Sequence, residues 1–512
     1  MLFRSALMLL AGLAHAASMA NPWNGQPLGW LQLVALTALV WQLRQCQRPA
    51  HAAGLGWLFA TGWLAGTFWW LFVAMHTYGG LAAWLAAVAV VVLAAVLATY
   101  YALAAWAFVW LKPAGAVQQA MLFAAVWTLA ELARGVWFTG FGWGGAAYAH
   151  TDALARSAQY VGAYGVTALL ALIACLLALW IEAPRAPRKL RLAALAGVMA
   201  GAMAWSPGDY TVPTATLEVA LLQGNIAQDE KFVPGSGVAD SLRWYGEQLA
   251  TARASLVVAP ETAIPLLPAQ LPPGYWSALQ QRFASGEQAA LVGVPLGSAA
   301  LGYTNSVVGF KPGAASAAVE VPYRYDKHHL VPFGEFVPPL FRWFTAMMAI
   351  PLGDFNRGAV GQASFEWRGQ RLAPNVCYED LFGEELAARF VDPARAPTIF
   401  VNVSNIGWFG QTVALDQHLQ ISRMRVLEFA RPFIRATNTG DTVIIDYRGR
   451  VTHALERHTR GVLVGSVQGR DGLTPFAWWV SRFGLWPLWL IGVAVVALAA
   501  WRKRAGGHRE GP

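Results

Sequence analysis

The chain has 512 residues, of which 56% are hydrophobic and only 13% are charged. An ordinary soluble domain has roughly 45–50% apolar and about 25% charged residues, so this composition excludes a plain soluble enzyme. The formal net charge of +9 raises the question of a nucleic-acid partner, and the answer depends on where the charges lie.

The basic surplus lies in the two apolar ends of the chain. Residues 1–206 carry ten Lys or Arg and three Asp or Glu, a balance of +7, and the tail from Arg502 adds +3. The segment 207–501 is therefore left with a charge of −1. A nearly neutral middle segment lacks the electrostatic footprint of a nucleic-acid binder, so we expect no nucleic-acid partner.

Apolar runs at both ends predict membrane-spanning helices, each of which needs about 20 residues. We expect seven spans in residues 1–206, an outer domain at 207–482, and an eighth span with a basic tail at 483–512. The predicted spans are 5–20, 28–43, 54–75, 81–104, 117–137, 160–182, 190–206 and 483–501.

The loop charges predict that both termini lie on the inner side of the membrane. With that orientation twelve Lys or Arg lie inside, and only Arg134 and Arg156 lie outside. The outer domain then faces the periplasm if the cell is a Gram-negative bacterium. An alternative is that residues 1–16 are a signal peptide, since Ala14-His15-Ala16 has the small residues of a cleavage site. Cleavage there would remove the first predicted span and so flip the parity that the other loops support.

The outer domain alternates strand-like runs with amphipathic helices, which predicts an α/β layered structure with reactive groups at strand ends. The strand-like runs are TLEVALLQGN, SLVVAPE, AALVGVPLG, TNSVVGF, RLAPNVCYED, TIFVNVSN, TVIIDYRGRV and GVLVGSVQ. The predicted helices are VADSLRWYGEQLATAR, GEELAARF and LDQHLQISRMRVLEFAR.

Three reactive side chains follow apolar or aromatic runs of this domain. Glu261 ends SLVVAPE, Lys327 follows the aromatic YRYD, and Cys377 follows RLAPNV. Each also has a simpler interpretation: a solvated carboxylate, a surface cation and an inert buried thiol. Cys377 is the single cysteine of the outer domain, and an unpaired thiol in an oxidising compartment requires a reason.

These residue types together match the needs of acyl transfer. The predicted helix after Cys377 and a nearby ammonium are expected to lower the pKa of the thiol, because both favour the thiolate. Glu261 would take the proton, Lys327 would supply the cation, and Cys377 would be the nucleophile. The backbone N–H of Tyr378, together with Lys327, would hold the oxyanion of a tetrahedral intermediate. Sequence order alone does not show that these groups meet.

Five strings distributed along the outer domain resemble one known family. They are PE at 260–261, DKHHLVPFGEFVP at 326–338, CYE at 377–379, SNIGWFG at 404–410 and QHLQISRMRVLEFARPFIRATNTG at 417–440. The chain resembles the apolipoprotein N-acyltransferases, membrane-embedded members of the nitrilase superfamily, over essentially its whole length. The resemblance implies a polytopic α-helical membrane domain of eight spans and a periplasmic nitrilase-like α-β-β-α sandwich.

The resemblance also implies roles for individual residues. Glu261, Lys327 and Cys377 match the family's base, its intermediate-stabilising lysine and its acyl-accepting cysteine. Further positions match residues that support them: Glu335, Tyr378 and Glu379. Two positions depart from the family pattern, since Phe232 stands where a Trp can occur and Ile406 where an Asp can occur.

The implied reaction moves an acyl chain from a phospholipid, through a thioester on Cys377, to the α-amino group of a diacylglyceryl-cysteine lipoprotein. We expect an inner-membrane monomer with no metal and no cofactor, and a structural role for His328 and His329. One alternative is a membrane-anchored amidohydrolase that uses water as acceptor. A transporter or scaffold is another, but the ionisable groups inside the predicted spans are chiefly Glu131 and Arg134, whose spacing predicts an ion pair.

The apolar run at 336–355 is either ordinary core or a mobile lid over the acyl region. Candidate lid residues in this run are Phe336, Leu340, Phe341, Trp343, Phe344, Met347, Met348 and Ile350. Phe232, Trp408 and Phe409 are candidates for the wall of the same acyl pocket.

Overall fold

The computed structural model describes residues 2–183, 185–205, 209–313, 323–338, 341–345, 347 and 354–507. The chain divides into two compact units. The first comprises Met1–Leu71, Trp84–Asp209 and Phe483–Pro512, and the second comprises Phe72–Ala83 and Tyr210–Arg482.

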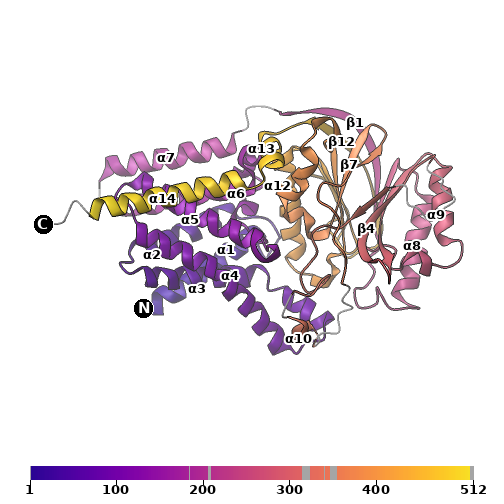
Figure 1. Ribbon diagram of the computed structural model, residues 1–512, viewed down its shortest axis with the longest axis horizontal. Helices are drawn as coiled ribbons and strands as arrows, with labels where there is room; N and C mark the ends of the chain where they lie inside the picture. Colours follow the sequence, from indigo (N-terminus) through magenta and orange to yellow (C-terminus); the bar gives the residue numbers. More distant parts are fainter. Residues whose placement is uncertain are drawn as a thin grey trace. The chain divides into compact units, whose positions relative to one another are not determined.

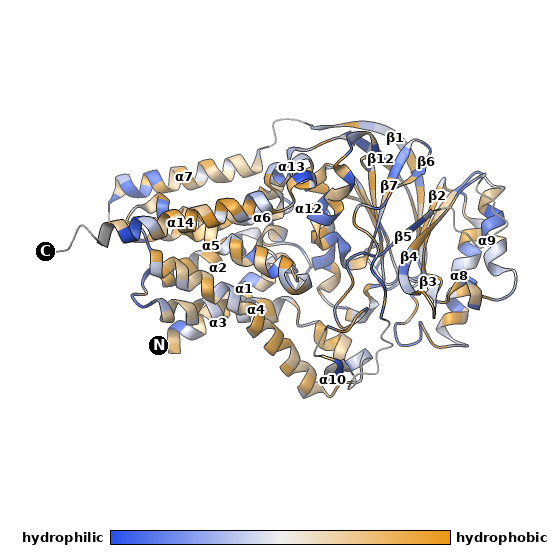
Figure 2. Cartoon of the chain, in the orientation of Figure 1, coloured by the Kyte–Doolittle hydropathy of each residue, from blue (hydrophilic) through white to orange (hydrophobic). Residues whose placement is uncertain are grey.

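The first unit consists mainly of long helices (Figure 1). They are α1 (Leu2–Met19), α2 (Gly29–Arg44), α3 (Pro49–Thr67), α4 (Ala83–Leu111), α5 (Ala116–Val136), α6 (Ala158–Glu182), α7 (Ala186–Ala204) and α14 (Trp486–Gly507). Each predicted span has a helix, and Figure 2 shows apolar residues along nearly all of α4.

Within the described residues, five helices are long and apolar enough to cross a membrane. They are Leu2–Met19, Ala83–Leu111, Ala116–Thr139, Leu154–Glu182 and Trp486–Ala505. The helix α2 has only 16 residues, and α7 begins with a basic run at Arg188–Arg191. A membrane domain is therefore supported, while the count of eight spans stays a prediction.

The predicted third span, 54–75, is wrong at its carboxyl end. The helix α3 stops at Thr67 because Phe68 leaves helical geometry, with φ −119° and ψ 33°. Farther on, Val73–Tyr78 forms a π-helix, η1, that belongs to the second unit. Hydropathy did not reveal this break because the residues on both sides of it are equally apolar.

The predicted ion pair in the fifth helix is confirmed. Arg134 Nη2 lies 3.0 Å from Glu131 Oε2, and both side chains are buried. Arg134 also donates to the hydroxyl of Tyr101 and to the carbonyls of Phe141 and Trp143. This arginine therefore joins α5, α4 and the chain after α5.

The second unit contains two six-stranded sheets. The first has the order β12-β1-β2-β3-β4-β5, and the second β11-β10-β9-β8-β7-β6. The strands of the first sheet are β1 (Thr211–Gln223), β2 (Leu256–Ala259), β3 (Ala289–Ser298), β4 (Gly302–Phe310), β5 (Tyr323–Asp326) and β12 (Gly461–Gly472). Those of the second are β6 (Phe365–Trp367), β7 (Gln370–Val376), β8 (Ile399–Ser404), β9 (Phe433–Thr437), β10 (Val443–Ile445) and β11 (Val451–Ala454).

Helices cover the outer faces of both sheets (Figure 1). The helices α8 (Gly237–Thr251) and α9 (Tyr275–Ala284) lie against the first sheet, and α12 (Ala414–Phe429) lies against the second. The predicted α-β-β-α sandwich is thus confirmed. Shorter helices complete the unit: α10 (Arg342–Thr345), α11 (Gly383–Ala387) and α13 (Pro475–Phe483).

The apolar core fills the space between the two sheets. Val219 and Leu291 of the first sheet and Val376 and Val401 of the second are fully buried in this core. A second core, which includes Phe283, lies between the first sheet and its helices. Strands buried on both faces are largely apolar, which explains why strands such as β2 and β3 were recognisable as continuous apolar runs.

Parallel pairing brings the ends of several strands to one edge. The strands β1, β2 and β3 are parallel neighbours, as are β7, β8 and β9. In the second sheet Asn375, Asn402 and Arg435 occupy paired positions on three adjacent strands. Glu261 follows β2 and Cys377 follows β7, so both lie beyond carboxyl ends, where reactive groups of α/β sheets gather.

Candidate active site

Glu261 is held in a buried turn directly after β2. Its carboxylate accepts hydrogen bonds from Asn305 Nδ2 at 2.7 Å and from the backbone N–H of Asn405 at 2.8 Å. Its backbone carbonyl accepts from Lys231 Nζ at 3.1 Å. The next residue, Thr262, has a positive φ of 48°, so the turn is sharp. These contacts fix the orientation of the carboxylate.

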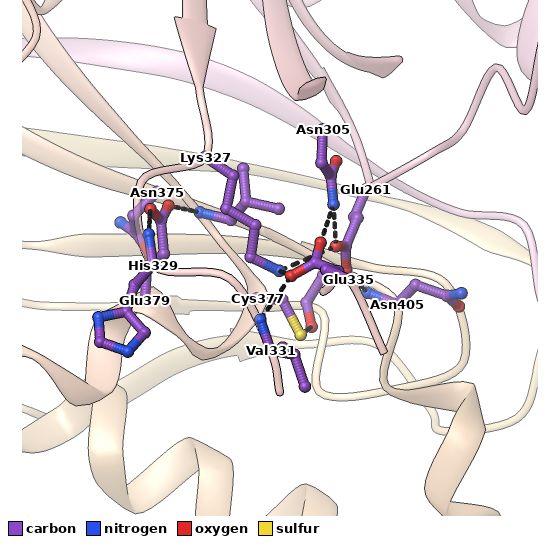
Figure 3. Close-up of polar contacts among 12 residues, drawn as sticks. Glu261, Asn305, Lys327, His329, Val331, Glu335, Asn375, Cys377, Glu379 and Asn405 are labelled. Carbon is purple, nitrogen blue, oxygen red and sulfur yellow. Dashed lines mark hydrogen bonds and ion pairs between the residues drawn. The ribbon is translucent and has the colours of Figure 1, made fainter. Parts of the chain in front are cut away.

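Lys327 follows β5 and pairs with two carboxylates (Figure 3). Its ammonium lies 2.8 Å from Glu335 Oε2 and 3.4 Å from Glu261 Oε1. Asn305 Nδ2 donates to both glutamates at 2.7 Å, and the backbone N–H of Val331 donates to Glu335 at 2.8 Å. One cation and one amide therefore hold two carboxylates side by side.

Cys377 lies beside this cluster at the end of β7 (Figure 3). Its φ of 55° is in the left-handed region, which costs a non-glycine residue about 1–2 kcal/mol. The carbonyl of Cys377 accepts from Asn402 Nδ2 at 2.8 Å, and its sulfur accepts from the Ser404 hydroxyl at 3.3 Å. Glu261, Lys327 and Cys377, separate in the sequence, are thus brought together.

The pKa values in this cluster follow from burial and charge. Burial, reinforced by the charge of Glu261, raises the pKa of the Cys377 thiol to about 12. The pKa of Glu261 lies below its usual value, because Lys327 and the hydrogen bonds from Asn305 and Asn405 outweigh the opposite effect of burial. The pKa of Lys327 is raised, since Glu335 and Glu261 outweigh its desolvation. The resting site therefore holds a thiol, a carboxylate and an ammonium.

The expectation of a lowered thiol pKa is wrong. Lys327 does favour the thiolate, but burial and the Glu261 charge outweigh it. Cys377 is the first residue of a 3-10 turn, Cys377–Leu381, and the helix α11 after it has only five residues. A short turn provides little helix dipole. Attack by the sulfur consequently needs a base.

The comparisons with known proteins follow the same two-part division. Residues 11–176 match the family described as the apolipoprotein N-acyltransferase N-terminal domain, and residues 218–472 match the carbon-nitrogen hydrolases. A protein of Verminephrobacter eiseniae named apolipoprotein N-acyltransferase is 60% identical over 499 residues, covering 93% of this chain and 92% of its own. The chain belongs to the apolipoprotein N-acyltransferase family. It is an acyltransferase of the nitrilase superfamily and a membrane protein.

Other relatives carry the same name. A protein of Ralstonia nicotianae is 43% identical, with 99% of this chain and 94% of its own covered. Among solved structures, an amidase of Nesterenkonia AN1 from the nitrilase superfamily is 17% identical, with a TM-score of 0.37, and covers 53% of this chain and 97% of its own.

In this acyltransferase, Glu379 connects the Cys377 turn to the Lys327 loop. Its carboxylate accepts from the backbone N–H of Val376 at 2.7 Å, and from those of His328 at 2.6 Å and His329 at 3.1 Å. The Tyr325 hydroxyl donates to it at 2.8 Å. Glu379 thus holds the backbone next to Cys377 and Lys327 in place.

Tyr378 and the two histidines form an adjoining cluster. The ring of His329 stacks on Phe382 at 3.5 Å and meets Tyr378 edge-on at 5.4 Å. His329 Nδ1 lies 2.8 Å from Glu385, and His328 Nδ1 lies 2.7 Å from the Gly358 carbonyl. These histidines pack and bond within the protein.

The lid candidates are described only in part. Leu340, Met348 and Ile350 lie outside the described residues, as does the side chain of Phe344. Phe341, Trp343 and Met347 are exposed, and Phe341 meets Phe333 edge-on at 5.5 Å. The remaining described candidate of this run, Phe336, lies under the guanidinium of Arg357 at 4.9 Å. The lid stays a prediction.

The candidates for the pocket wall are placed on two loops. Phe232 is 39% exposed and follows the buried Lys231, whose ammonium lies 5.9 Å from its ring. Trp408 is half-buried and meets Tyr78 of η1 edge-on at 6.0 Å. The contact with η1 was not expected, because residues 73–75 had been predicted as part of a span.

Sequence reasoning missed three groups that contact Glu261: Asn305, Asn405 and Lys231. Asn305 interrupts the apolar strand β4 with an amide, and this interruption was a visible signal. Asn405 acts through its backbone N–H, which no sequence pattern reveals. Burial lowers the pKa of Lys231 to about 7, yet the sequence shows only one lysine among polar neighbours.

Proposed function

We propose that this acyltransferase moves an acyl chain from a phospholipid to the N-terminal α-amino group of a diacylglyceryl-cysteine lipoprotein, through a thioester on Cys377. The observation that carries the proposal is the buried cluster in which Cys377 lies beside Glu261 and a Lys327–Glu335 pair. The names of the relatives support the acceptor, because they specify an apolipoprotein.

In the first half-reaction the sulfur of Cys377 attacks the ester carbonyl of the phospholipid while Glu261 takes the thiol proton. The proton transfer moves negative charge from the carboxylate to the sulfur, so the net charge of the cluster does not change. The loss of the Glu261 charge also removes one cause of the high thiol pKa. The tetrahedral oxyanion is held by the Lys327 ammonium and the Tyr378 N–H.

Collapse of that intermediate breaks the ester bond and releases lysophospholipid, whose alkoxide takes the proton from Glu261. In the second half-reaction the lipoprotein amine attacks the thioester and gives a proton to Glu261. The second collapse breaks the carbon–sulfur bond, and the departing thiolate recovers that proton as the thiol. Both halves use the same base and the same oxyanion site, and the thioester between them makes the reaction ping-pong. Glu335 keeps Lys327 charged and oriented through both steps.

A trapping experiment tests the donor and the nucleophile. We expect the full-length protein in detergent, incubated with phospholipid labelled in its acyl chain, to acquire label on Cys377 that hydroxylamine removes. Cys377→Ala should acquire none, and Cys46→Ser, which leaves the second unit unchanged, should label like the wild type. Labelling of Cys377→Ala would contradict the assignment.

A second experiment distinguishes transfer from hydrolysis. A peptide that bears diacylglyceryl-cysteine at its N-terminus should discharge the thioester faster than water does. The matched control is the same peptide with its α-amino group acetylated. Equal discharge with both peptides would favour the amidohydrolase alternative.

We further propose that the protein lies in the bacterial inner membrane as a monomer, with both termini inside and the catalytic unit in the periplasm. The distribution of basic residues supports this orientation. A catalytic unit joined to membrane helices in one chain suits a reaction in which both substrates are anchored in a bilayer.

A further inference from the structure

A buried polar network contacts the backbone carbonyl of Cys377. Its members are His418, Ser422, Asp380, Arg435 and Asn402, and each is at most 1% exposed. His418 and Ser422 are one turn apart on α12, Arg435 and Asn402 are paired on β9 and β8, and Asp380 lies in the turn after Cys377. The reaction proposed above uses none of them.

The network determines which nitrogen of His418 carries the proton. Arg435 Nη2 lies 3.1 Å from His418 Nδ1, and a guanidinium can only donate. Nδ1 therefore accepts, and Nε2 is the N–H donor. Nε2 lies 2.9 Å from Asp380 Oδ1 and 3.3 Å from the carbonyl oxygen of Cys377, and both are acceptors.

Asp380 and Arg435 are themselves held in place. The Ser422 hydroxyl donates to Asp380 Oδ2, and Arg435 Nη1 donates to the His418 carbonyl at 2.9 Å. Arg435 Nη1 lies 4.0 Å from Asp380 Oδ2, so the buried carboxylate has a buried cation beside it. The imidazole is consequently fixed at both nitrogens, and its N–H has a fixed direction.

That direction matters because the carbonyl of Cys377 belongs to a residue with a φ of 55°. A left-handed cysteine persists only where its surroundings hold it. Two side-chain donors reach this carbonyl: Asn402 Nδ2 at 2.8 Å and His418 Nε2 at 3.3 Å. Rotation of this peptide group would also move the sulfur relative to Glu261.

We propose that His418, oriented by Asp380 and Arg435, is a positioning residue that holds the Cys377 backbone so that the sulfur faces its base. The proposal deepens the function assigned above and rests on Cys377 as the acyl acceptor. It assigns His418 no proton transfer, since its N–H points at a backbone carbonyl and at Asp380.

The test compares His418→Gln with His418→Met. The two side chains have similar length and volume, but only Gln retains an N–H donor. The readout is the single-turnover rate of thioester formation as a function of phospholipid concentration. We expect the maximal rate of the Met variant to fall by about 100-fold, as displacement of reacting groups by about 1 Å does, with little change in the half-saturating concentration. The Gln variant should stay within about fivefold of the wild type.

A control variant separates positioning from general stability. Glu428→Gln removes a charge from the buried Arg425–Glu428 pair, which also lies on α12. We expect this variant to lower the melting temperature while its rate of thioester formation stays near that of the wild type. Equal rates for the Gln and Met variants of His418, or a rate loss in Glu428→Gln as large as in His418→Met, would overturn the proposal.

A second variant tests the proposal even if His418→Met does not fold. Arg435→Lys keeps the buried charge but removes the planar fork that donates to His418 Nδ1, so the imidazole proton is no longer fixed on Nε2. We expect thioester formation to slow by about tenfold, and an unchanged rate would contradict the proposal.

Alkylation of Cys377 by iodoacetamide distinguishes the positioning role of His418 from the proposed acyl transfer. It is measured in a background of Cys46→Ser and Cys175→Ala, so that Cys377 is the cysteine that reacts. This reaction needs no acyl donor, so it reports the position of the sulfur whether or not phospholipid is the substrate. Slower alkylation in His418→Met supports the positioning role even if acylation fails for another reason, and unchanged alkylation contradicts it.

Discussion

Lys231 is a buried residue whose charge makes stability depend on pH. Burial lowers the pKa of its ammonium to about 7, against an unfolded value of about 10.4. Between these two values the unfolded chain holds a proton that the folded chain has released. Stability therefore rises with pH across this window, by at most about 1.4 kcal/mol per pH unit, and this group adds no dependence below it.

We predict that Lys231→Met flattens this dependence. The variant has no ammonium to desolvate. The difference in melting temperature, variant minus wild type, should therefore be larger at about pH 7 than at about pH 9.5. The lost hydrogen bond to the Glu261 carbonyl adds an offset of about 1 kcal/mol that does not change with pH. Thermal unfolding of the full-length protein in detergent measures both effects. Lys311→Met, at a half-buried lysine, is the matched control, and the same pH slope in both variants would contradict the prediction.

At the scale of elements, sequence patterns located the central strands β2, β3, β7 and β8 and the residues that follow them. The strand β2 is a continuous apolar run and β7 contains the strand-like run RLAPNV, so Glu261 and Cys377 could be placed at strand ends. The strands β5, β6 and β9 were missed, and TVIIDYRGRV, predicted as one strand, instead forms β10, a turn and the first residue of β11. The strand β9 contains the fully buried Arg435, and a charge within a short run hides its apolar character. Burial of that arginine depends on His418 and Asp380, which belong to other elements.

The site was predictable in its reactive groups but not in its electrostatics. A motif supplies the identities of Lys327 and Glu335, yet the pKa of Cys377 depends on how completely the folded chain excludes water around it. Asn402 donates to the carbonyl of Cys377, and the backbone N–H of Asn405 donates to the carboxylate of Glu261. Both contacts depend on strand register. Such contacts appear only when the strands are paired.

The π-helix η1 is an element with a testable role at the site. Tyr78 meets Trp408 edge-on, and a side chain added at Gly410 would contact Val73 at 3.4 Å. The turn of Trp408 directly follows Asn405, whose N–H holds Glu261. We expect η1 to brace this turn, since single-turn π-helices are often found at functional sites.

We predict that Tyr78→Ala and Trp408→Ala both slow thioester formation and that their effects are not additive. An aromatic pair contributes about 0.5–1.5 kcal/mol beyond its burial. The activation free energy lost in the double variant should therefore be smaller, by that amount, than the sum of the losses in the two single variants. Single-turnover rates of the four proteins measure it. Tyr78→Ala combined with Trp478→Ala, an exposed aromatic of α13, should be additive. Additivity in the first pair would show that the contact does not act on the turn.

At the scale of the whole molecule, the charge distribution from which we expect no nucleic-acid partner also predicts topology. The basic surplus lies in the helical ends, and the catalytic unit between them is nearly neutral. Lys and Arg are retained on the cytoplasmic side, so the basic tail after α14 should lie inside and the catalytic unit outside. The two locations can be distinguished by single cysteines, because the chain has only three of its own.

We predict opposite accessibility for two introduced cysteines in a background of Cys46→Ser, Cys175→Ala and Cys377→Ala. Thr251→Cys, at an exposed position of α8, should react with a membrane-impermeant maleimide in spheroplasts. Arg502→Cys, exposed near the end of α14, should react only in inverted vesicles or after detergent. Because α14 alone separates the catalytic unit from the tail, labelling of both positions in spheroplasts would mean that this helix does not cross the membrane. Labelling of Arg502→Cys alone would mean that the orientation is reversed.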